Sequence, residues 1–200
     1  MKRMEYRCVL VPAQGDIDWD RIESAELNET VDGSPSRLRT VVKMCRSPEY
    51  VHIRFECEDD HIVATYENRD DPIYKEDVVE VFLDEEGKGT SYREYEVSPR
   101  GVIFDAWITK QPEERPAVDV SWNDDGMRAA VTRSAGGTLI YDIAFANETF
   151  DKPPVPGASW NMNFYRIDDD PQGKRHYSAW SPTGRIDFHR PDKFGTVQFV

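Results

Sequence analysis

Short alternations of apolar and polar residues, separated by glycine and proline turns, constrain the fold of this chain more than any other feature. Three such runs follow one another over residues 78–84, 92–98 and 102–107, with glycine- or proline-bearing turns between them. Alternation with a period of two gives a strand two distinct faces, and turns of this kind join adjacent strands. The stretch therefore predicts a three-stranded meander.

The rest of the chain shows the same pattern and little helical periodicity. Its clearest alternation runs over residues 51–58, with apolar residues at odd positions and polar residues at even positions. About ten short strands of this kind favour an all-β fold, a two-sheet antiparallel β-sandwich of immunoglobulin-like or jelly-roll-like type, with an open barrel as the alternative. Long loops and at most one or two short helices, one of them within residues 16–26, complete the expected single domain of residues 1–200.

A strong excess of acidic residues restricts the partners of the chain. The formal net charge of −13 disfavours a nucleic-acid backbone or an anionic membrane surface as partner, and it favours neutral or cationic ligands. Cys8, Cys45 and Cys57 lack CxxC spacing and are expected to be reduced, buried thiols. The N-terminal residues form neither a signal peptide nor a membrane span, which predicts a cytoplasmic protein, or a secreted one if a leader precedes the sequence.

The sequence motifs of common enzyme classes are missing from the chain. It contains no G-x-S-x-G, H-E-x-x-H, P-loop or G-x-G-x-x-G pattern, so serine hydrolase, zinc protease and nucleotide-binding sites have no support. A glycosidase needs two carboxylates beside the scissile bond. The candidates are Glu80, Glu94, Glu96 and Asp105. Acidic loops such as residues 168–170 could supply oxygens to calcium, but none has EF-hand spacing, so no metal ligands are assigned.

One acid interrupts the most apolar strand of the meander. Glu80 lies between Val79 and Val81, and because an unpaired carboxylate is costly to bury, it must face water or a partner. Tyr74 and Asp77 precede it at intervals of three residues. An aromatic ring packs on the C–H face of a sugar, while carboxylates bind its hydroxyl groups. This group of residues therefore indicates a small polyol-binding site.

Several loose motifs follow one another along nearly the whole chain. They are YVHIRFECED at 50–59, YKEDVVEVFLD at 74–84, YEVSPRG at 95–101, WNMNFYR at 160–166, AWSP at 179–182 and FG at 194–195. Their order resembles that of the family 9 carbohydrate-binding modules, which belong to the wider group of DOMON-like β-sandwiches. The resemblance implies a β-sandwich that binds sugars without catalysis and occurs beside glycosidases that break down polysaccharides.

The resemblance also implies a binding site in which two aromatic rings clamp a sugar. By position, Tyr74 replaces the first tryptophan of the clamp, and Trp180 is the candidate for its second wall. Glu80 matches the glutamate that binds sugar hydroxyls in the family. A mono- or oligosaccharide is therefore the expected partner, with no role for nucleic acid or membrane.

Four further polar residues belong to the implied site. Asn163 and Arg166 lie where the family carries polar ligand contacts, so we expect them to hydrogen-bond sugar hydroxyls. Glu96 and Ser98 stand on the strand after the clamp, where the family can carry an arginine and an asparagine. No organic cofactor is expected. The resemblance allows a structural calcium ion, without identifying its ligands in this chain.

Two other functions remain open on sequence grounds. One is a glycoside hydrolase, or a glycosidase-associated domain, in which Glu80 and Glu96 would be the catalytic pair. The other is a DOMON-like sandwich that binds haem or a protein, although no residue is identified as an axial haem ligand. The sequence specifies neither the sugar and its linkage nor the oligomeric state.

Overall fold

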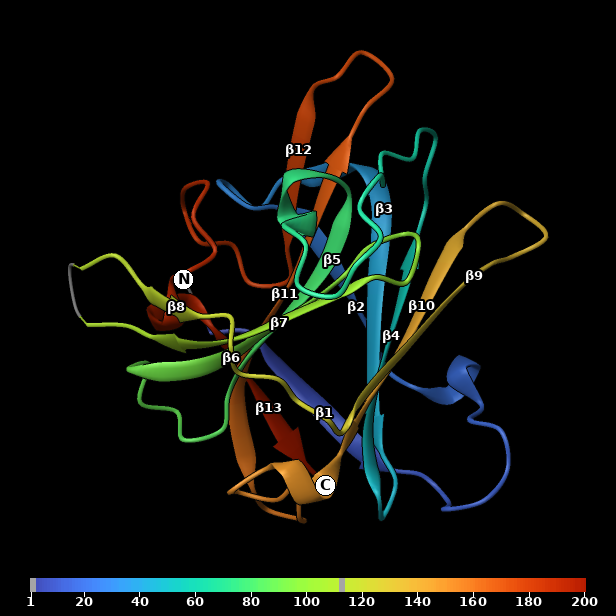
Figure 1. Cartoon of the computed structure of the whole chain (residues 1–200). Coiled ribbons are helices and arrows are strands. Elements are labelled where there is room, and N and C mark those ends of the chain that lie inside the picture. Colours follow the sequence, from blue (N-terminus) through green and yellow to red (C-terminus); the bar gives the residue numbers. More distant parts are fainter. Residues whose placement is uncertain (1–2, 112–113) are drawn as a thin grey trace.

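The chain folds almost entirely into β-strands in a computed structural model that describes residues 3–111 and 114–200 (Figure 1). The strands are β1 (Glu5–Leu10), β2 (Ser24–Glu29), β3 (Pro35–Arg46), β4 (Tyr50–Cys57), β5 (Val78–Asp84), β6 (Ser91–Val97), β7 (Ile103–Thr109), β8 (Ala117–Asp119), β9 (Met127–Arg133), β10 (Leu139–Ala146), β11 (Ser159–Asp169), β12 (Arg175–Ala179) and β13 (Gly195–Phe199). Short 3-10 helices are η1 (Trp19–Arg21), η2 (Ile73–Lys75), η3 (Asn147–Thr149) and η4 (Pro191–Lys193). The all-β prediction is confirmed. Within the described ranges, no helix has the length and apolarity needed to cross a membrane.

Six strands close into a hydrogen-bonded ring in the order β1, β3, β2, β12, β11, β13. β1 closes the ring because it pairs in parallel with β13 along one edge and with the end of β3 along the other. The Tyr6 hydroxyl strengthens this closure, since it accepts a hydrogen bond of 2.7 Å from the backbone N–H of Met44 on β3. The other four pairings in the ring are antiparallel.

Two wings extend the sheet away from the ring. β4, β10 and β9 continue from β3, whereas β5, β6, β7 and β8 continue from β11. In Figure 1 the first wing ends at β9 on the right of the view, and the second ends at β8 on the left. All thirteen strands therefore belong to one hydrogen-bonded network. The expectation of two separate antiparallel sheets is corrected on both counts, because the network is continuous and β1 pairs in parallel.

The main hydrophobic core lies between the two wings. The alternating residues of β4, Val51, Ile53 and Phe55, are fully buried there. β5 contributes Val79 and Val81 to the same core. The three cysteines are free and buried, as the sequence predicts. Burial of such alternating faces on both wings is the main source of stability in a fold of this kind.

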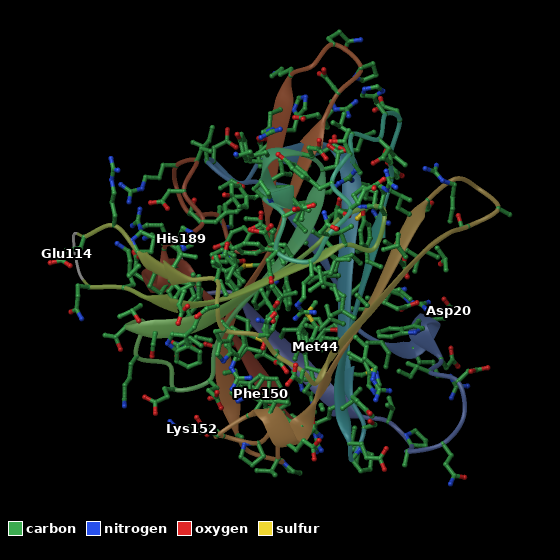
Figure 2. All side chains as sticks on the ribbon, in the orientation of Figure 1. Asp20, Met44, Glu114, Phe150, Lys152 and His189 are labelled. Carbon is green, nitrogen blue, oxygen red and sulfur yellow. The ribbon has the colours of Figure 1, made fainter. Side chains whose placement is uncertain are left out.

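A second hydrophobic cluster covers the outer face of the β5–β7 wing. It contains Ile73, Val78, Phe82, Tyr92, Phe104, Ala106, Ile108, Tyr165, Ile167, Ala179 and Phe194. β5 is consequently buried on both faces along its whole length. Figure 2 labels Met44 and Phe150 of the main core, and it places His189 apart from them, on the side of the second cluster. This second face carries the candidate site.

The structure differs from the sequence prediction in its short helices and in one loop. The short helix expected within residues 16–26 is present as η1, but the described residues contain four such helices, more than the one or two expected. The expected polar loop after residue 168 contains β12, which pairs with β11 and β2. Both β2 and β12 are short strands with weak apolar alternation, and their partners in the ring determine their conformation.

Candidate functional site

Three glutamates meet on the outer face of the β5–β6 wing. Glu80 lies directly opposite Glu96 in the antiparallel register of β5 and β6. Glu94 is two residues before Glu96, so it shares the same face of β6. One carboxylate oxygen from each of the three residues lies within 4.8 Å of the others. The spacing of two along adjacent strands therefore creates a compact acidic cluster.

A cavity of about 500 Å³ opens over this cluster. It is lined by Tyr74, Glu80, Phe82, Glu94, Glu96, Phe104, Val118, Val120, Ile167, Tyr177, Ile186, Asp187, Phe188 and His189. Aromatic and aliphatic side chains form most of the walls, whereas the acids converge on the floor. Small-ligand sites usually have this composition, in which apolar walls exclude water and a few polar groups fix the orientation of the ligand.

Two aromatic rings on the walls are held in place by other rings. Tyr74 on η2 is 43% exposed and packs edge-to-face on Phe104, with 5.8 Å between ring centroids. Phe188 stacks on Tyr165 with a centroid distance of 4.0 Å and an interplanar angle of 9°. Rings held in this way can contact a ligand with little loss of side-chain entropy.

Glu96 has an unusual environment within the acidic cluster. It is 1% exposed, and neither of its carboxylate oxygens has a hydrogen-bond partner among the described residues. The backbone N–H of Tyr74 stabilises its charged form slightly without reaching hydrogen-bonding geometry. A buried polar group without a partner costs free energy, so the position is unfavourable for the protein alone.

Burial raises the pKa of all three glutamates, and repulsion raises the pKa of Glu80 and Glu96 further. Loss of hydration raises the pKa of Glu94 to about 7. Burial, followed by repulsion from Glu94, raises the pKa of Glu80. Burial, followed by the charges of Glu80 and Glu94, also raises the pKa of Glu96. The cluster therefore retains protons near neutral pH, and it can both donate and accept hydrogen bonds.

Among the described residues, no positive charge in the cavity balances these acids. The lining that they form contains no lysine or arginine. His189 lies 2.8 Å from the Tyr92 hydroxyl through Nδ1, and burial lowers the pKa of His189 to about 4. The imidazole is therefore neutral at pH 7. Asp187 also lines the cavity, and its carboxylate lies 2.7 Å from the guanidinium of Arg185, which does not line it.

A second cavity of about 550 Å³ lies on the outer face of the other wing, over β9 and β10. Arg54 lines it and forms a two-pronged ion pair with Asp142, at 2.6 and 2.8 Å. The guanidinium of Arg54 also packs over the Trp19 ring, 4.6 Å from its centroid. Since these charged groups already satisfy one another, this second cavity is the weaker candidate for ligand binding.

A second group of carboxylates could in principle hold a metal ion. Oxygens of Asp59, Asp77 and Asp168 lie within 4.8 Å of one another. However, the guanidinium of Arg166 donates to Asp59 at 2.9 Å and to Asp168 at 2.6 Å. Asp77 accepts backbone N–H groups of residues 63 and 169. Because an arginine already neutralises this group, the cluster that contains Glu96 fits a cationic ligand better.

Comparison with known proteins identifies the family of this chain. Residues 11–200 match the family described as "Carbohydrate family 9 binding domain-like". The chain belongs to this family. The resemblance expected from the sequence motifs is thus confirmed, and membership supports carbohydrate binding as the general function.

Solved structures share the fold of this family 9 domain. A protein of Bacteroides uniformis, to which carbohydrate binding is provisionally ascribed, has a TM-score of 0.80 at 17% identity, with 100% of both chains covered. A family 9 carbohydrate-binding module of Caldicellulosiruptor kristjanssonii in complex with cellotriose has a TM-score of 0.70 at 13% identity, covering 98% of this chain and 93% of that one. A family 9 module of the same organism in complex with glucose has a TM-score of 0.67 at 14% identity, covering 97% of this chain and 95% of that one.

A relative in sequence comes from Arthroderma benhamiae. It is 21% identical to this family 9 domain over 186 residues, which cover 86% of the chain and 84% of the relative. It is described as an extracellular protein.

The structure brings three of the expected site residues together in this family 9 domain. Tyr74, Glu80 and Glu96 all line the cavity over β5 and β6. Ser98 lies at the end of β6 and does not line it. Its hydroxyl accepts backbone N–H groups of Arg100 and Val102, at 3.3 and 3.2 Å, and so stabilises the β6–β7 turn.

Trp180 does not form the second wall of a clamp with Tyr74. It is 1% exposed within the main core, where it packs against Tyr6 and Phe164. A Cβ atom on Gly195 would overlap its ring, which shows how closely β13 encloses it. The expected clamp is therefore corrected. Phe188 occupies a wall of the cavity instead.

Asn163 and Arg166 are also committed to the interior of the protein. The Asn163 amide donates to the Tyr165 hydroxyl and to Ser181 O, both at 2.8 Å, and its oxygen accepts two backbone N–H groups. Arg166 donates to Thr40 and to a backbone carbonyl as well as to two aspartates. Neither residue lines the cavity, so the expected contacts with sugar hydroxyls are corrected.

Several cavity residues are not expected as sugar contacts from the sequence. In the sequence, Glu94 is a candidate only as a catalytic acid of a glycosidase. Its spacing of two from Glu96 nonetheless places both acids on one face of β6. Tyr177, Phe188 and His189 come from a segment without a clear sequence signal. Tertiary packing alone brings that segment over β5 and β6.

Proposed function

We propose that this domain binds carbohydrate non-catalytically in the cavity over β5 and β6. The observation that carries the proposal is the combination of aromatic walls with buried acids on the floor, in a member of a carbohydrate-binding family. Tyr74 would pack on the C–H face of a sugar ring, with Phe188 on another side. Glu80 and Glu96 would bind hydroxyl groups, since protonated carboxyls donate and ionised ones accept.

The volume and chemistry of the cavity support a mono- or short oligosaccharide as ligand. A space of about 500 Å³ is within the range of small-ligand sites. Its open side allows a chain of sugars to extend outward from one enclosed ring. The glucose and cellotriose complexes of the Caldicellulosiruptor kristjanssonii module support testing these sugars first.

Calorimetric titration of the purified domain with glucose, cellobiose and cellotriose tests the proposal. We expect saturable binding, and we expect the Tyr74→Ala variant to bind about tenfold or more weakly because the stacking surface is lost. Val155→Ala is the matched control, since Val155 is an exposed apolar residue outside the cavity lining. Absence of heat from any neutral or amino sugar at millimolar concentration would overturn carbohydrate binding.

A glycoside hydrolase is the second candidate, favoured by the paired acids. Oxygens of Glu80 and Glu96 lie within 4.8 Å, near the separation of about 5–5.5 Å that retaining glycosidases use. Both acids lie on one floor, whereas hydrolysis requires them to flank the bond, so binding without turnover is the better supported function. Turnover of aryl glycosides that disappears in Glu80→Gln would establish the hydrolase instead.

An extracellular site of action is part of the proposal. The description of the Arthroderma benhamiae relative as extracellular supports it. Extracellular polysaccharides would then be accessible to the domain. The cytoplasmic placement expected from the N-terminal residues, and a structural calcium ion, both stay predictions.

A further inference from the structure

Within the part of the chain that the structure describes, the acidic floor of the cavity has no counter-charge in its lining. Glu80, Glu94 and Glu96 converge there, and no lysine, arginine or charged histidine of residues 3–111 or 114–200 lines the cavity with them. A neutral sugar would leave this cluster without a compensating cation. The site therefore has an electrostatic property that binding of a neutral polyol does not require.

Other buried acids of the protein have donors close by. Glu85 accepts from Arg93 at 2.9 Å, and Asp105 accepts from Arg69 at 2.6 Å. Asp84 accepts the backbone N–H groups of Gly87 and Gly89, each at 2.7 Å. Among the buried carboxylates of residues 3–111 and 114–200, only Glu96 has both oxygens enclosed from water and without a hydrogen-bond partner. Since Glu96 also lines the cavity, a ligand is the natural source of its missing donors.

The number and geometry of the acids match an ammonium group. An alkylammonium carries three N–H donors, and three carboxylate oxygens within 4.8 Å of one another can surround it. Hydrogen bonds between a charged donor and a charged acceptor are the strongest of their kind. Burial raises the pKa of Glu94 to about 7, and the charge of Glu94 raises the pKa values of Glu80 and Glu96, so a bound ammonium would replace protons in balancing the cluster.

The walls distinguish an organic cation from a metal ion. Phe82, Phe104 and Ile167 stand around the floor and offer no oxygen ligands to complete the coordination of calcium or magnesium. Aromatic faces do attract an ammonium group and pack on the C–H groups of a ring. The cavity therefore suits a molecule with one cationic end and a partly apolar body.

We propose that this cavity prefers an amino sugar, whose protonated amino group is held by Glu80, Glu94 and Glu96 while Tyr74 packs on its ring. This inference rests on the proposed carbohydrate binding and specifies its substrate class. Glucosamine and its short β-linked oligomers are the simplest ligands of that class.

Titration calorimetry of the whole chain with glucosamine, N-acetylglucosamine and glucose tests the inference. At about pH 6.5 and low salt, we expect glucosamine to bind about tenfold or more tightly than glucose, because it adds charge-assisted hydrogen bonds. Acetylation removes the positive charge, so N-acetylglucosamine should lose this advantage. The Glu96→Gln variant should reduce the ratio of glucosamine to glucose affinity, whereas Glu86→Gln, at an exposed acid outside the cavity, should leave the ratio unchanged.

Each outcome of this experiment decides a separate point. Equal affinity for glucosamine and glucose would overturn the amino-sugar preference and leave carbohydrate binding intact. No binding of any of the three sugars would overturn carbohydrate binding itself. Ethanolamine binding as tightly as glucosamine, or calcium displacing glucosamine, would assign the cluster to a simple amine or to a metal and so overturn the inference. The comparison of ligands on the unmodified protein decides the question even if Glu96→Gln fails to fold.

Discussion

Glu96 is the residue at which the needs of folding and of binding conflict most directly. Its carboxyl group is buried, unpartnered and next to two other acids. A hydrophobic residue at this place in β6 would pack with Phe104 and avoid the cost of desolvation. Local features that oppose stability are expected at functional sites, and the acid at position 96 therefore supports the assignment of the cavity.

Stability should depend on pH through this cluster. The folded protein holds protons on the glutamates that the unfolded chain, with ordinary carboxyl pKa values, releases. The folded-state pKa of Glu94 is about 7 against 4.5 without the fold, so the contribution of Glu94 to stability is largest below about pH 4.5 and is lost as the pH rises toward about 7. We expect Glu96→Gln to show a smaller fall, because the raised pKa of the Glu96 carboxyl no longer contributes.

Urea unfolding between about pH 5 and 8, followed by tryptophan fluorescence, measures this dependence. Asp77, with a pKa raised to about 6 by burial, contributes in the same direction in every variant, so the comparison uses differences from the wild type. Glu86→Gln should follow the wild-type curve. Parallel curves for Glu96→Gln and the wild type would show that the cluster does not carry the dependence.

Some of the site residues expected from the sequence line the cavity, and others lie elsewhere for a physical reason. Tyr74, Glu80 and Glu96 fall on the cavity because strand alternation determines the face on which β5 and β6 side chains lie. Trp180 and Arg166 each have a partner that is distant in sequence, Tyr6 for Trp180 and Asp59 for Arg166. Sequence patterns show neither that Tyr6 and Phe164 enclose Trp180 nor that two aspartates neutralise Arg166.

Among the elements, β11 connects the ring to the wing that carries the site. It pairs with β12 and β13 within the ring and with β5 outside it. The Arg166 side chain fixes one end of β11, since its guanidinium bonds to Asp59, Asp168 and the Glu58 carbonyl. The floor of the cavity therefore depends on a charged network that lies outside the cavity.

Replacing Arg166 should destabilise the fold strongly. In Arg166→Met, Asp59 would lose its arginine partner while staying mostly buried, and Asp168 would keep only Arg37. Breaking a buried pair of this kind costs about 3–5 kcal/mol. Arg100→Met removes an exposed pair with Glu67 and should cost at most about 1 kcal/mol. Chemical denaturation of both variants measures the two values. Equal losses would mean that the network around Arg166 contributes no more than a surface ion pair.

Most strands of the structure could be located from the sequence, but their partners could not. Regular alternation marks β4, β5, β6 and β10. The two faces of each strand differ in how deeply they are buried or in which side chains they pack against. Alternation does not specify which strands pair. The expected sandwich is missed because β1 pairs in parallel with β13, from the opposite end of the chain. Such long-range pairing depends on the whole fold and leaves no local signal.

At the scale of the whole molecule, β1 is the strand that closes the ring, although it lies outside the residues that match the family. The match begins at residue 11, whereas β1 ends at Leu10. Tyr6 and Cys8 are nonetheless fully enclosed in the main core. Without β1, the facing edges of β3 and β13 would lose their hydrogen-bond partners and the core would be open to water.

Deleting residues 1–10 should therefore lower stability although every residue of the family match is kept. The loss of two buried side chains and two rows of strand pairing amounts to several kcal/mol, which should reduce Tm by about 10 °C or more. Thermal unfolding followed by circular dichroism measures the change. A synthetic peptide of residues 3–12 should restore part of the loss by occupying the same edges, and a scrambled peptide should not. If the shortened chain unfolds at the temperature of the full chain, the closed ring is not what stabilises this fold.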